Sequence, residues 1–269
     1  KGGRIEVLYP GAGGLPPNPP AGGAAKLTHR PEAGFEAGYY WGELTGDQAA
    51  SDAKSLVFDT PPLETDLEIA GLPKVKLEAR SWAPLAHWVA RLEDVAPDGA
   101  SALVTGAALN GSQRRSRLAP ETLVPGEAGA FDLDLHFTTW RFSKGHRIRL
   151  ALANGSFPML WPTPEPVSST VLFGAGTRLE LPVAPPAPAE ASLPPPEPRS
   201  ERSDTADLGS RGWPYESLRS SDAASGETVV TWRGDDLYRV PSASVSTRQE
   251  MSYRVHPARP GAASWEGRA

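Results

Sequence analysis

Prolines and glycines recur so often along this chain that they constrain its fold more than any other feature. The sequence contains 29 prolines and 27 glycines, and few windows longer than about a dozen residues lack both. Proline inside a helix removes a hydrogen bond and clashes with the preceding turn, and glycine lowers helix propensity. Long helices are therefore disfavoured, and short strands joined by turns are favoured. We expect an all-β protein.

Apolar and polar residues alternate with a period of two in several stretches, as is typical of strands with one buried face. In the clearest case, 131–137, phenylalanine and leucine alternate with Asp132, Asp134 and His136. Further strands are predicted at 55–58, 74–80, 88–93, 103–109, 147–152, 170–173, 178–183, 228–232, 237–240 and 251–255, and one short helix at 47–53. This number of strands favours an antiparallel jelly-roll β-sandwich of the galactose-binding-like type, with proline- and glycine-rich connectors.

Turn residues between these strands predict several hairpins. The best defined joins 88–93 to 103–109 through Ala96-Pro97-Asp98-Gly99. The stretch 131–137 could pair with 147–152, which would place Arg147 and Arg149 opposite its aspartates. Two more hairpins are predicted at 170–183, and at 228–240 around Gly234-Asp235.

Changes in composition predict four regions along the chain. Residues 1–54 are expected to form a connector with a Gly/Pro-rich segment, and 55–183 the β-sandwich core. Residues 184–210, dense in proline, are expected to form a semi-rigid linker or a surface strap. Residues 211–269 are expected to form C-terminal strands that are incomplete, so that the chain is a fragment or a processed subunit.

The net charge of −5 argues against a nucleic-acid or membrane partner, because such surfaces need clustered excess Lys and Arg. The densest basic group, Arg114, Arg115 and Arg117, is expected to be a solvated loop. The chain has no cysteine, so it has no disulfide framework and no thiolate nucleophile. The compartment stays open, with a slight preference for the cytoplasm.

Motifs that carry catalytic chemistry are missing from the sequence. It has no G-x-S-x-G elbow, and Ser210 and Ser225 are expected to be loop serines. The five histidines, at 29, 87, 136, 146 and 256, do not show the close spacing of zinc ligands. We therefore predict no catalytic residue, no metal site and no cofactor.

A few residues could nevertheless form a binding site. His146 is expected to point partly inward beside Trp140, as a hydrogen-bonded structural histidine in preference to a catalytic base. Asp94 and Asp98 are expected to serve the backbone of a turn in preference to forming a carboxylate pair. Exposed tryptophans, with Trp82, Trp88, Trp140 and Trp161 as candidates, could bind a sugar, although packing in a core or an interface is the commoner use of tryptophan.

Three runs of sequence resemble a known family. They are SLVFDTPPLETDLEIAGLPKVKLEARS (55–81), VARLEDVAPDGASALVTGAALN (89–110) and FSKGHRIRLALANGSFPMLWPTPEP (142–166). Together with LVPG at 123–126 and the strand at 179–183, they resemble the C-terminal domain of X-Pro dipeptidyl-peptidases and of cocaine-esterase-like (CocE/NonD) acyl hydrolases. The match extends roughly over 47–183.

This resemblance implies a jelly-roll sandwich that packs on an α/β-hydrolase domain, which holds the whole Ser-Asp-His triad. The implied activity is serine hydrolysis of amide or ester bonds, with this chain inactive alone. Its expected roles are to help wall the substrate cleft and to assemble subunits, with the hydrolase domain of the same or a partner chain as partner and a homo-oligomer as an option. Trp82, Trp140, His146 and Trp161 are the cleft or ligand candidates. The alternative is a carbohydrate- or ligand-binding jelly-roll module.

Overall fold

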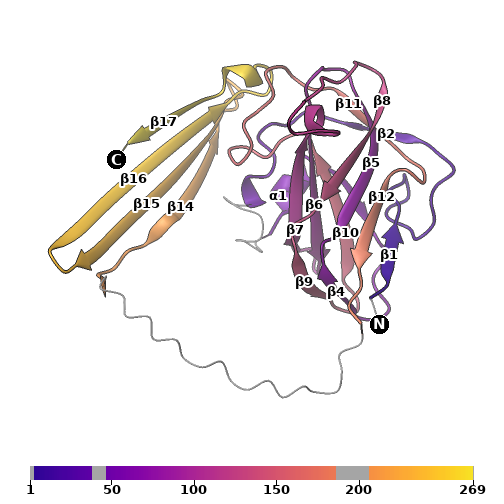
Figure 1. Cartoon of the computed structure of the whole chain (residues 1–269), viewed down its shortest axis with the longest axis horizontal. Coiled ribbons are helices and arrows are strands. Elements are labelled where there is room, and N and C mark those ends of the chain that lie inside the picture. Colours follow the sequence, from indigo (N-terminus) through magenta and orange to yellow (C-terminus); the bar gives the residue numbers. More distant parts are fainter. Residues whose placement is uncertain (1–2, 38–46, 186–205, 269) are drawn as a thin grey trace. The chain divides into compact units, whose positions relative to one another are not determined.

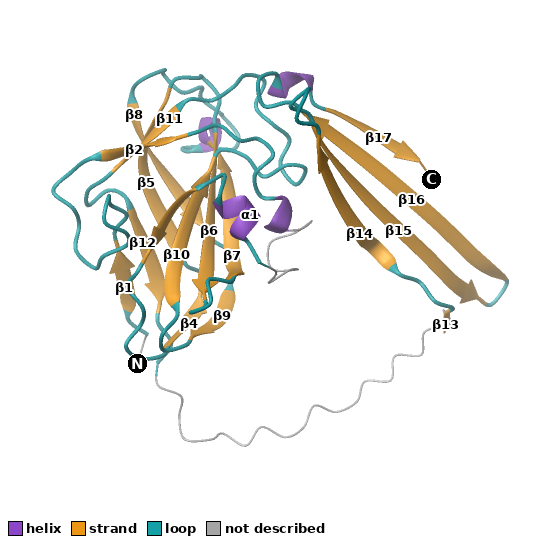
Figure 2. Cartoon of the chain, turned by 180° about the vertical axis from the view of Figure 1, so that it is seen from behind, coloured by secondary structure: helices purple, strands orange, loops and turns teal. Residues whose placement is uncertain are grey.

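The computed structural model describes residues 3–37, 47–185 and 206–268, and strands are the main regular secondary structure in all three stretches (Figures 1 and 2). The chain divides into unit 1, Lys1–Pro185 with His256–Ala262, and unit 2, Pro186–Val255 with Ala263–Ala269. The described helical segments are α1 (Ala49–Asp52) and single 3-10 turns at Phe35–Ala37, Gly111–Gln113 and Pro260–Ala262. None of these segments has the length and hydropathy to span a membrane. The predictions of an all-β fold and of a helix near 47–53 are confirmed.

The larger sheet of unit 1 has six antiparallel strands. They are β1 (Ile5–Leu8), β2 (Ala24–Leu27), β5 (Lys74–Ser81), β8 (Ala128–Asp134), β11 (Ser169–Leu172) and β12 (Arg178–Pro182). One edge of β5 pairs with β8 along residues 74–80. The other edge of β5 pairs with two strands one after the other: β12 along 74–76 and β11 along 79–81. The hairpin predicted at 170–183 is therefore wrong, because both strands pair with β5 and form one line interrupted at 173–177.

The second sheet of unit 1 has the order β3-β10-β6-β7, formed by β3 (Leu56–Asp59), β6 (His87–Val95), β7 (Ser101–Asn110) and β10 (Arg147–Ala153). The hairpin predicted between 88 and 109 is confirmed as β6 and β7, with a bulge after Leu92. A short ladder joins β4 (Leu67–Gly71) to β9 (Thr138–Phe142). The predicted pairing of 131–137 with 147–152 is wrong, since β8 pairs with β5, and β10 pairs with β3 and β6.

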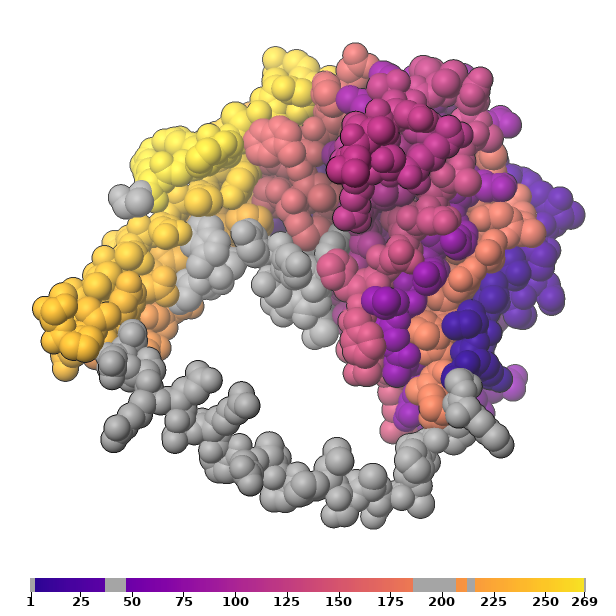
Figure 3. All heavy atoms as spheres, viewed as in Figure 1, coloured from indigo at the N-terminus to yellow at the C-terminus, as the bar shows by residue number. Residues whose placement is uncertain are grey.

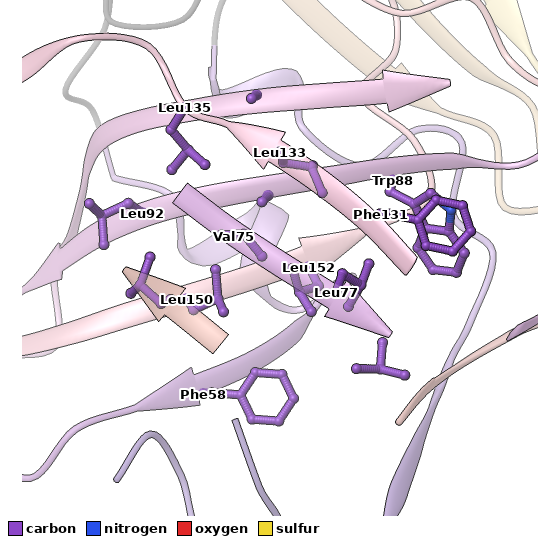
Figure 4. Close-up of a cluster of buried hydrophobic side chains, with 14 of the residues drawn as sticks. Phe58, Val75, Leu77, Trp88, Leu92, Phe131, Leu133, Leu135, Leu150 and Leu152 are labelled. Carbon is purple, nitrogen blue, oxygen red and sulfur yellow. The ribbon is translucent and has the colours of Figure 1, made fainter. Parts of the chain in front are cut away.

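Side chains from both sheets of unit 1 meet in one apolar core (Figure 4). Val75 and Leu77 of β5 and Leu133 of β8 lie on one side of it, and Leu92 of β6 and Leu150 of β10 lie on the other. The strand alternation read from the sequence therefore places these residues correctly. At the end of the clearest pattern it fails, because Phe137 lies beyond β8 and is 68% exposed.

Two of the predicted regions differ in detail from the structure. Within 1–54, expected to be a connector, β1 and β2 pair with β12 and β11 and so extend the six-stranded sheet. The proline-rich linker predicted at 184–210 falls largely outside the described residues, which exclude 186–205.

Unit 2 is a single antiparallel sheet built on the hairpin of β15 (Thr228–Val240) and β16 (Ala243–Val255), which pair along their whole length. The remaining strands are β13 (Ala206–Asp207) and β14 (Gly212–Ser221) beside β15, and β17 (Ser264–Arg268) beside β16. The turn predicted at Gly234-Asp235 is wrong, because these residues pair with Gln249 and Arg248 inside the ladder.

Candidate functional site

The four candidate residues lie at opposite ends of the sandwich. Trp82 lies just after β5, in the segment that leads into the start of β6. Trp161 comes after the end of β10, and this end of β10 lies at the start of β6 as well, since Ala153 pairs with Val89. We call this the Trp82 end. Trp140 and His146 lie at the other end, next to Asp94 near the end of β6, which we call the Asp94 end. The four side chains therefore do not form a single site.

At the Asp94 end, one carboxylate joins two of the candidates. The indole Nε1 of Trp140 donates to Oδ2 of Asp94 at 2.9 Å, and Nδ1 of His146 lies 2.8 Å from Oδ1. The Asp94 side chain is only 8% exposed, whereas that of His146 is 27% exposed. The expectation that Asp94 serves a turn backbone is wrong, since its carboxylate oxygens bind two side chains contributed by distant segments.

The Asp94 contacts agree with the structural role predicted for His146. Among the described residues, its side-chain hydrogen bond goes to Asp94, and no serine hydroxyl bonds to it. An aspartate–histidine pair that lacks a nucleophile can orient side chains but cannot by itself transfer an acyl group. Trp140 also lines a groove of about 330 Å³ with Glu68, Thr139 and Arg141.

At the Trp82 end, both tryptophans reach solvent. Trp82 is 59% exposed and Trp161 is 45% exposed, with the Trp161 ring 6.0 Å from that of Phe157. The Trp82 ring lies over Gly126, where an added Cβ would come within 2.8 Å of it. Gly126 also has a φ of +82° and donates its N–H to the Ser81 carbonyl at 2.8 Å, so this position favours glycine.

A groove of about 410 Å³ lies beside Trp82, between the loop that follows β7 and strand β8. Ser81, Arg114, Arg115 and Val124 contribute to its lining. The magenta part of the chain, which includes this loop, lies on the surface of the space-filling view (Figure 3). The prediction of an exposed basic loop thus holds for Arg115 and Arg117, whereas the Arg114 side chain is only 13% exposed and donates to the carbonyls of Gly111 and Glu121.

The most heavily buried polar cluster was missed by sequence reasoning. Arg91 and Glu93 of β6 have fully buried side chains, and Nε of Arg91 donates to Oε1 of Glu93 at 2.8 Å. Nη2 of Arg91 reaches Asp52 of α1 at 2.9 Å. Arg149 of β10 bonds to Asp52 at 2.8 Å and to Asp59 of β3 at 2.7 Å. We call these five residues the buried charge cluster.

The strand pattern predicts that Arg91 and Glu93 lie on a wet face, which is wrong because α1 and the loops beside it cover that face. A signal was available in the sequence. Val89 and Val95 share the same face, and the two charges between them are opposite in sign and two residues apart, so they can neutralise one another when buried.

Burial raises the pKa of Glu93 to about 7, and the nearby Asp52 adds to the rise while Arg91 opposes it. The Ser101 hydroxyl donates to the second carboxylate oxygen of Glu93 at 2.9 Å. Nη1 of Arg91 is buried without a partner among the described residues. The cluster ties α1 to strands β3, β6 and β10 of the second sheet.

Two histidines near the Trp82 end are partly buried. Burial lowers the pKa of His29 to about 4, with a smaller contribution from His87, whose own pKa is lowered by burial. Both ring nitrogens of His29 and Nδ1 of His87 lack partners among the described residues. Among the residues that the structure describes, no group of three or more acidic or histidine side chains could hold a metal ion.

Comparison with known proteins identifies the fold of unit 1. Residues 7–183, about two thirds of the chain, match the family described as the X-Pro dipeptidyl-peptidase C-terminal non-catalytic domain. The chain belongs to this family. The resemblance carried by the three sequence runs is therefore confirmed.

Relatives of this X-Pro dipeptidyl-peptidase C-terminal domain include two proteins, of Mycobacterium bovis and Mycobacterium tuberculosis, whose names assign them to the serine esterases. Each is 31% identical over 160 residues, which cover 52% of this chain and 26% of the relative. The match thus spans about a quarter of the length of these relatives.

Among solved structures, the domain is similar to an α-amino acid ester hydrolase with a TM-score of 0.59 and 26% identity, covering 66% of this chain and 36% of that one. It also resembles an aminopeptidase from the marine sediment archaeon Thaumarchaeota archaeon, with a TM-score of 0.60 and 21% identity over 68% of this chain and 37% of that one. At that identity the second likeness shows the fold alone.

Proposed function

We propose that unit 1 is the non-catalytic part of a serine hydrolase that cleaves amide or ester bonds, and that its Trp82 end helps to wall the substrate cleft and to assemble the enzyme. The partner would be an α/β-hydrolase domain in the same chain or in another. The family description, non-catalytic, and the esterase and hydrolase names of the relatives support this proposal. The main structural support is the group of exposed apolar side chains at the Trp82 end.

Four large apolar side chains are exposed at or near this end, namely Trp82, Leu118, Val124 and Trp161. Tryptophan and arginine dominate the binding energy of protein interfaces, and here Arg115 lies in the groove beside Trp82. An exposed aromatic patch near a groove with charged residues of both signs in its lining is therefore suited to contact another domain.

The first test is chemical. The purified 269-residue chain should neither hydrolyse p-nitrophenyl esters nor be labelled by a fluorophosphonate serine reagent. Ester hydrolysis that this reagent abolishes would overturn the assignment of a non-catalytic role.

The second test concerns the surface. In an enzyme that contains this chain together with its hydrolase domain, Trp82→Ala and Trp161→Ala should lower kcat/KM or weaken assembly. Phe137→Ala is the matched control, since Phe137 is also a highly exposed aromatic residue but follows β8 toward the other end. An effect of Phe137→Ala alone would contradict the proposal. Saturable quenching of tryptophan fluorescence by glycans, lost in Trp161→Ala, would instead favour a carbohydrate-binding module.

A further inference from the structure

The groove beside Trp82 follows a free edge of the six-stranded sheet. Among the strands that the structure describes, β8 pairs only with β5, so its second edge has no neighbouring strand. The groove, of about 410 Å³, is lined by all of residues 127–132, which include the first five residues of β8. An unpaired strand edge therefore forms part of the wall of a concave site.

The hydrogen bonds around β8 show which of its backbone groups point toward this free edge. Leu135, just beyond β8, donates its N–H to the carbonyl of Pro73 on the β5 side. On the other strand, Glu78 pairs with Ala130 but donates its N–H to Thr177 on the far edge of β5. Backbone direction alternates along an antiparallel strand. The N–H and C=O groups that point away from β5 are therefore those of Ala128, Ala130 and Asp132.

These outward groups are suited to bind another strand. They make no hydrogen bond with any residue that the structure describes, and they repeat at every second residue, roughly 7 Å apart. The small side chains at 128–130 let another backbone come close. Residues 128–134 contain no proline and their ladder has no bulge, two of the features that commonly protect an exposed edge from pairing.

Charge in the groove adds a preference for the ligand. Three of the four charged side chains in its lining already have an ion-pair partner, namely Arg114, Arg115 and Asp132. The fourth, Glu127, is exposed and makes no ion pair with another described residue. A basic side chain on the ligand would therefore meet an unpaired carboxylate.

We propose that this groove, which we call the β8 groove, binds a short extended peptide that adds to the free edge of β8 as a further strand and directs a lysine or arginine side chain to Glu127. Main-chain hydrogen bonds supply affinity in this mode of recognition, and side-chain contacts supply specificity. The volume lies in the range of small-ligand sites and takes only a few residues. The occupant is a peptide substrate of the enzyme, and for this source alone the inference rests on the proposed function.

The test is an amide NMR titration of the ¹⁵N-labelled full chain with the blocked peptide acetyl-Thr-Val-Lys-Val-Thr-amide. Saturable shifts should centre on residues 127–132. In the bound state, hydrogen exchange should slow at the amides of Ala128, Ala130 and Asp132, and change less at Gly129 and Phe131, whose N–H groups point to β5. This alternation is the signature of an added strand, because docking of side chains alone would not produce it.

Two variants test the two contacts separately. Ala130→Pro removes one edge donor at a position where a strand tolerates proline, and should weaken binding about ten-fold. Glu127→Lys should weaken binding about five-fold and shift the preference to a peptide with glutamate in place of lysine. Glu64→Lys is the matched control, since it makes the same charge change at an exposed position outside the groove and should leave binding unchanged.

Shifts that do not saturate, protection that does not alternate, or equal weakening in Glu64→Lys would overturn the proposal. Dimerisation of the free chain that Ala130→Pro abolishes would also overturn it, because a second copy would then occupy the edge. Peptide binding is measured without catalysis, whereas the non-catalytic role is tested with the serine reagent. A failure of one is therefore distinguishable from a failure of the other.

Discussion

Arg91 and Glu93 show how two charges can be held in the middle of a covered sheet. Each has its opposite charge within hydrogen-bond distance, and Asp52 and Ser101 satisfy further atoms of the pair. A buried ion pair gains little net stability over an apolar pair, because desolvation offsets the attraction. Removing one partner is a different matter, since the other charge is then buried alone.

The raised pKa of Glu93 predicts a pH dependence of stability. In the folded state the Glu93 carboxyl keeps its proton up to about pH 7, whereas in the unfolded state it releases the proton near pH 4.5. The contribution of Glu93 to stability is therefore present below pH 4.5 and is lost as the pH rises to 7. Glu93→Gln should remove this slope when urea midpoints are measured from pH 4.5 to 8. Exposed Glu127→Gln should leave the slope as in the wild type; equal slopes in all three proteins would contradict the prediction.

His29 predicts a slope of the opposite sign. Its pKa is lowered to about 4 from an ordinary 6.5, so protonation of the unfolded state should reduce stability as the pH falls from 6.5 to 4. After allowance for partial exposure of the ring, the loss is about 1–2 kcal/mol. His29→Gln should flatten the acid limb of the stability profile, whereas exposed His136→Gln should not. Each slope is best obtained as the difference from the wild type, because those of His29 and Glu93 overlap.

At the scale of strands and helices, the buried charge cluster fastens α1 to the second sheet and joins the neighbouring strands β3 and β10 of that sheet. Arg91→Ala should lower the free energy of unfolding by about 3–5 kcal/mol, because Glu93 and Asp52 lose their buried partner. The measurement is equilibrium denaturation followed by circular dichroism. Lys76→Ala is the control: its partner Asp132 is 63% exposed, so the pair is screened by water and the change should be about 1 kcal/mol or less. Similar losses in the two variants would show that the cluster is not a special anchor.

Individual strands could be predicted from the sequence, but their neighbours could not. The alternation over 74–80 and 131–135 correctly gives which residues of β5 and β8 face the core. Alternation does not indicate which strands pair with one another. The sequence therefore predicts that Arg149 lies opposite the aspartates of β8, whereas Arg149 binds Asp52 and Asp59.

The turn predicted at Gly234-Asp235 is wrong for a related reason, because a local signal does not show which strands pair. Gly234-Asp235 is a strong local turn signal, yet the ladder continues through it because Gln249 and Arg248 pair on one side and Arg211 binds Asp235 on the other. The candidate site was predictable only in part. The sequence predicts that His146 lies beside Trp140, but it does not predict that Asp94 joins them, because Asp94 is 52 residues from His146 and follows the pattern of a turn residue.

At the scale of the whole molecule, the chain divides into two units by its internal contacts. The core of unit 1 lies between its two sheets, and in unit 2 the side chains of Val230 and Trp232 are buried, with the Trp232 ring 5.0 Å from Tyr253. Units that are connected mainly within themselves are expected to unfold as separate cooperative units.

Trp232→Ala should therefore destabilise unit 2 by about 3 kcal/mol or more, since a large buried ring is lost. In hydrogen exchange followed by mass spectrometry, residues 228–255 should lose protection while β5 and β6 keep theirs. Leu218→Ala, at a 43% exposed position of the same sheet, is the control and should change little. Loss of protection in β5 and β6 to the same extent would mean that the whole chain unfolds as one unit.

The pairing of β1 with β12 and of β2 with β11 has a consequence for the order in which the chain is assembled. Ile5 meets Pro182 and Leu27 meets Ser169, whereas β6 and β7 are neighbours in sequence. Closing the longer loops carries the larger entropic cost, so these contacts should form last. During translation, the first strands leave the ribosome well before their partners. Their apolar residues, Leu8 and Leu27 among them, then stay unprotected until more than 140 further residues have been added, and this is the interval in which a nascent chain is most exposed to chaperones and to aggregation.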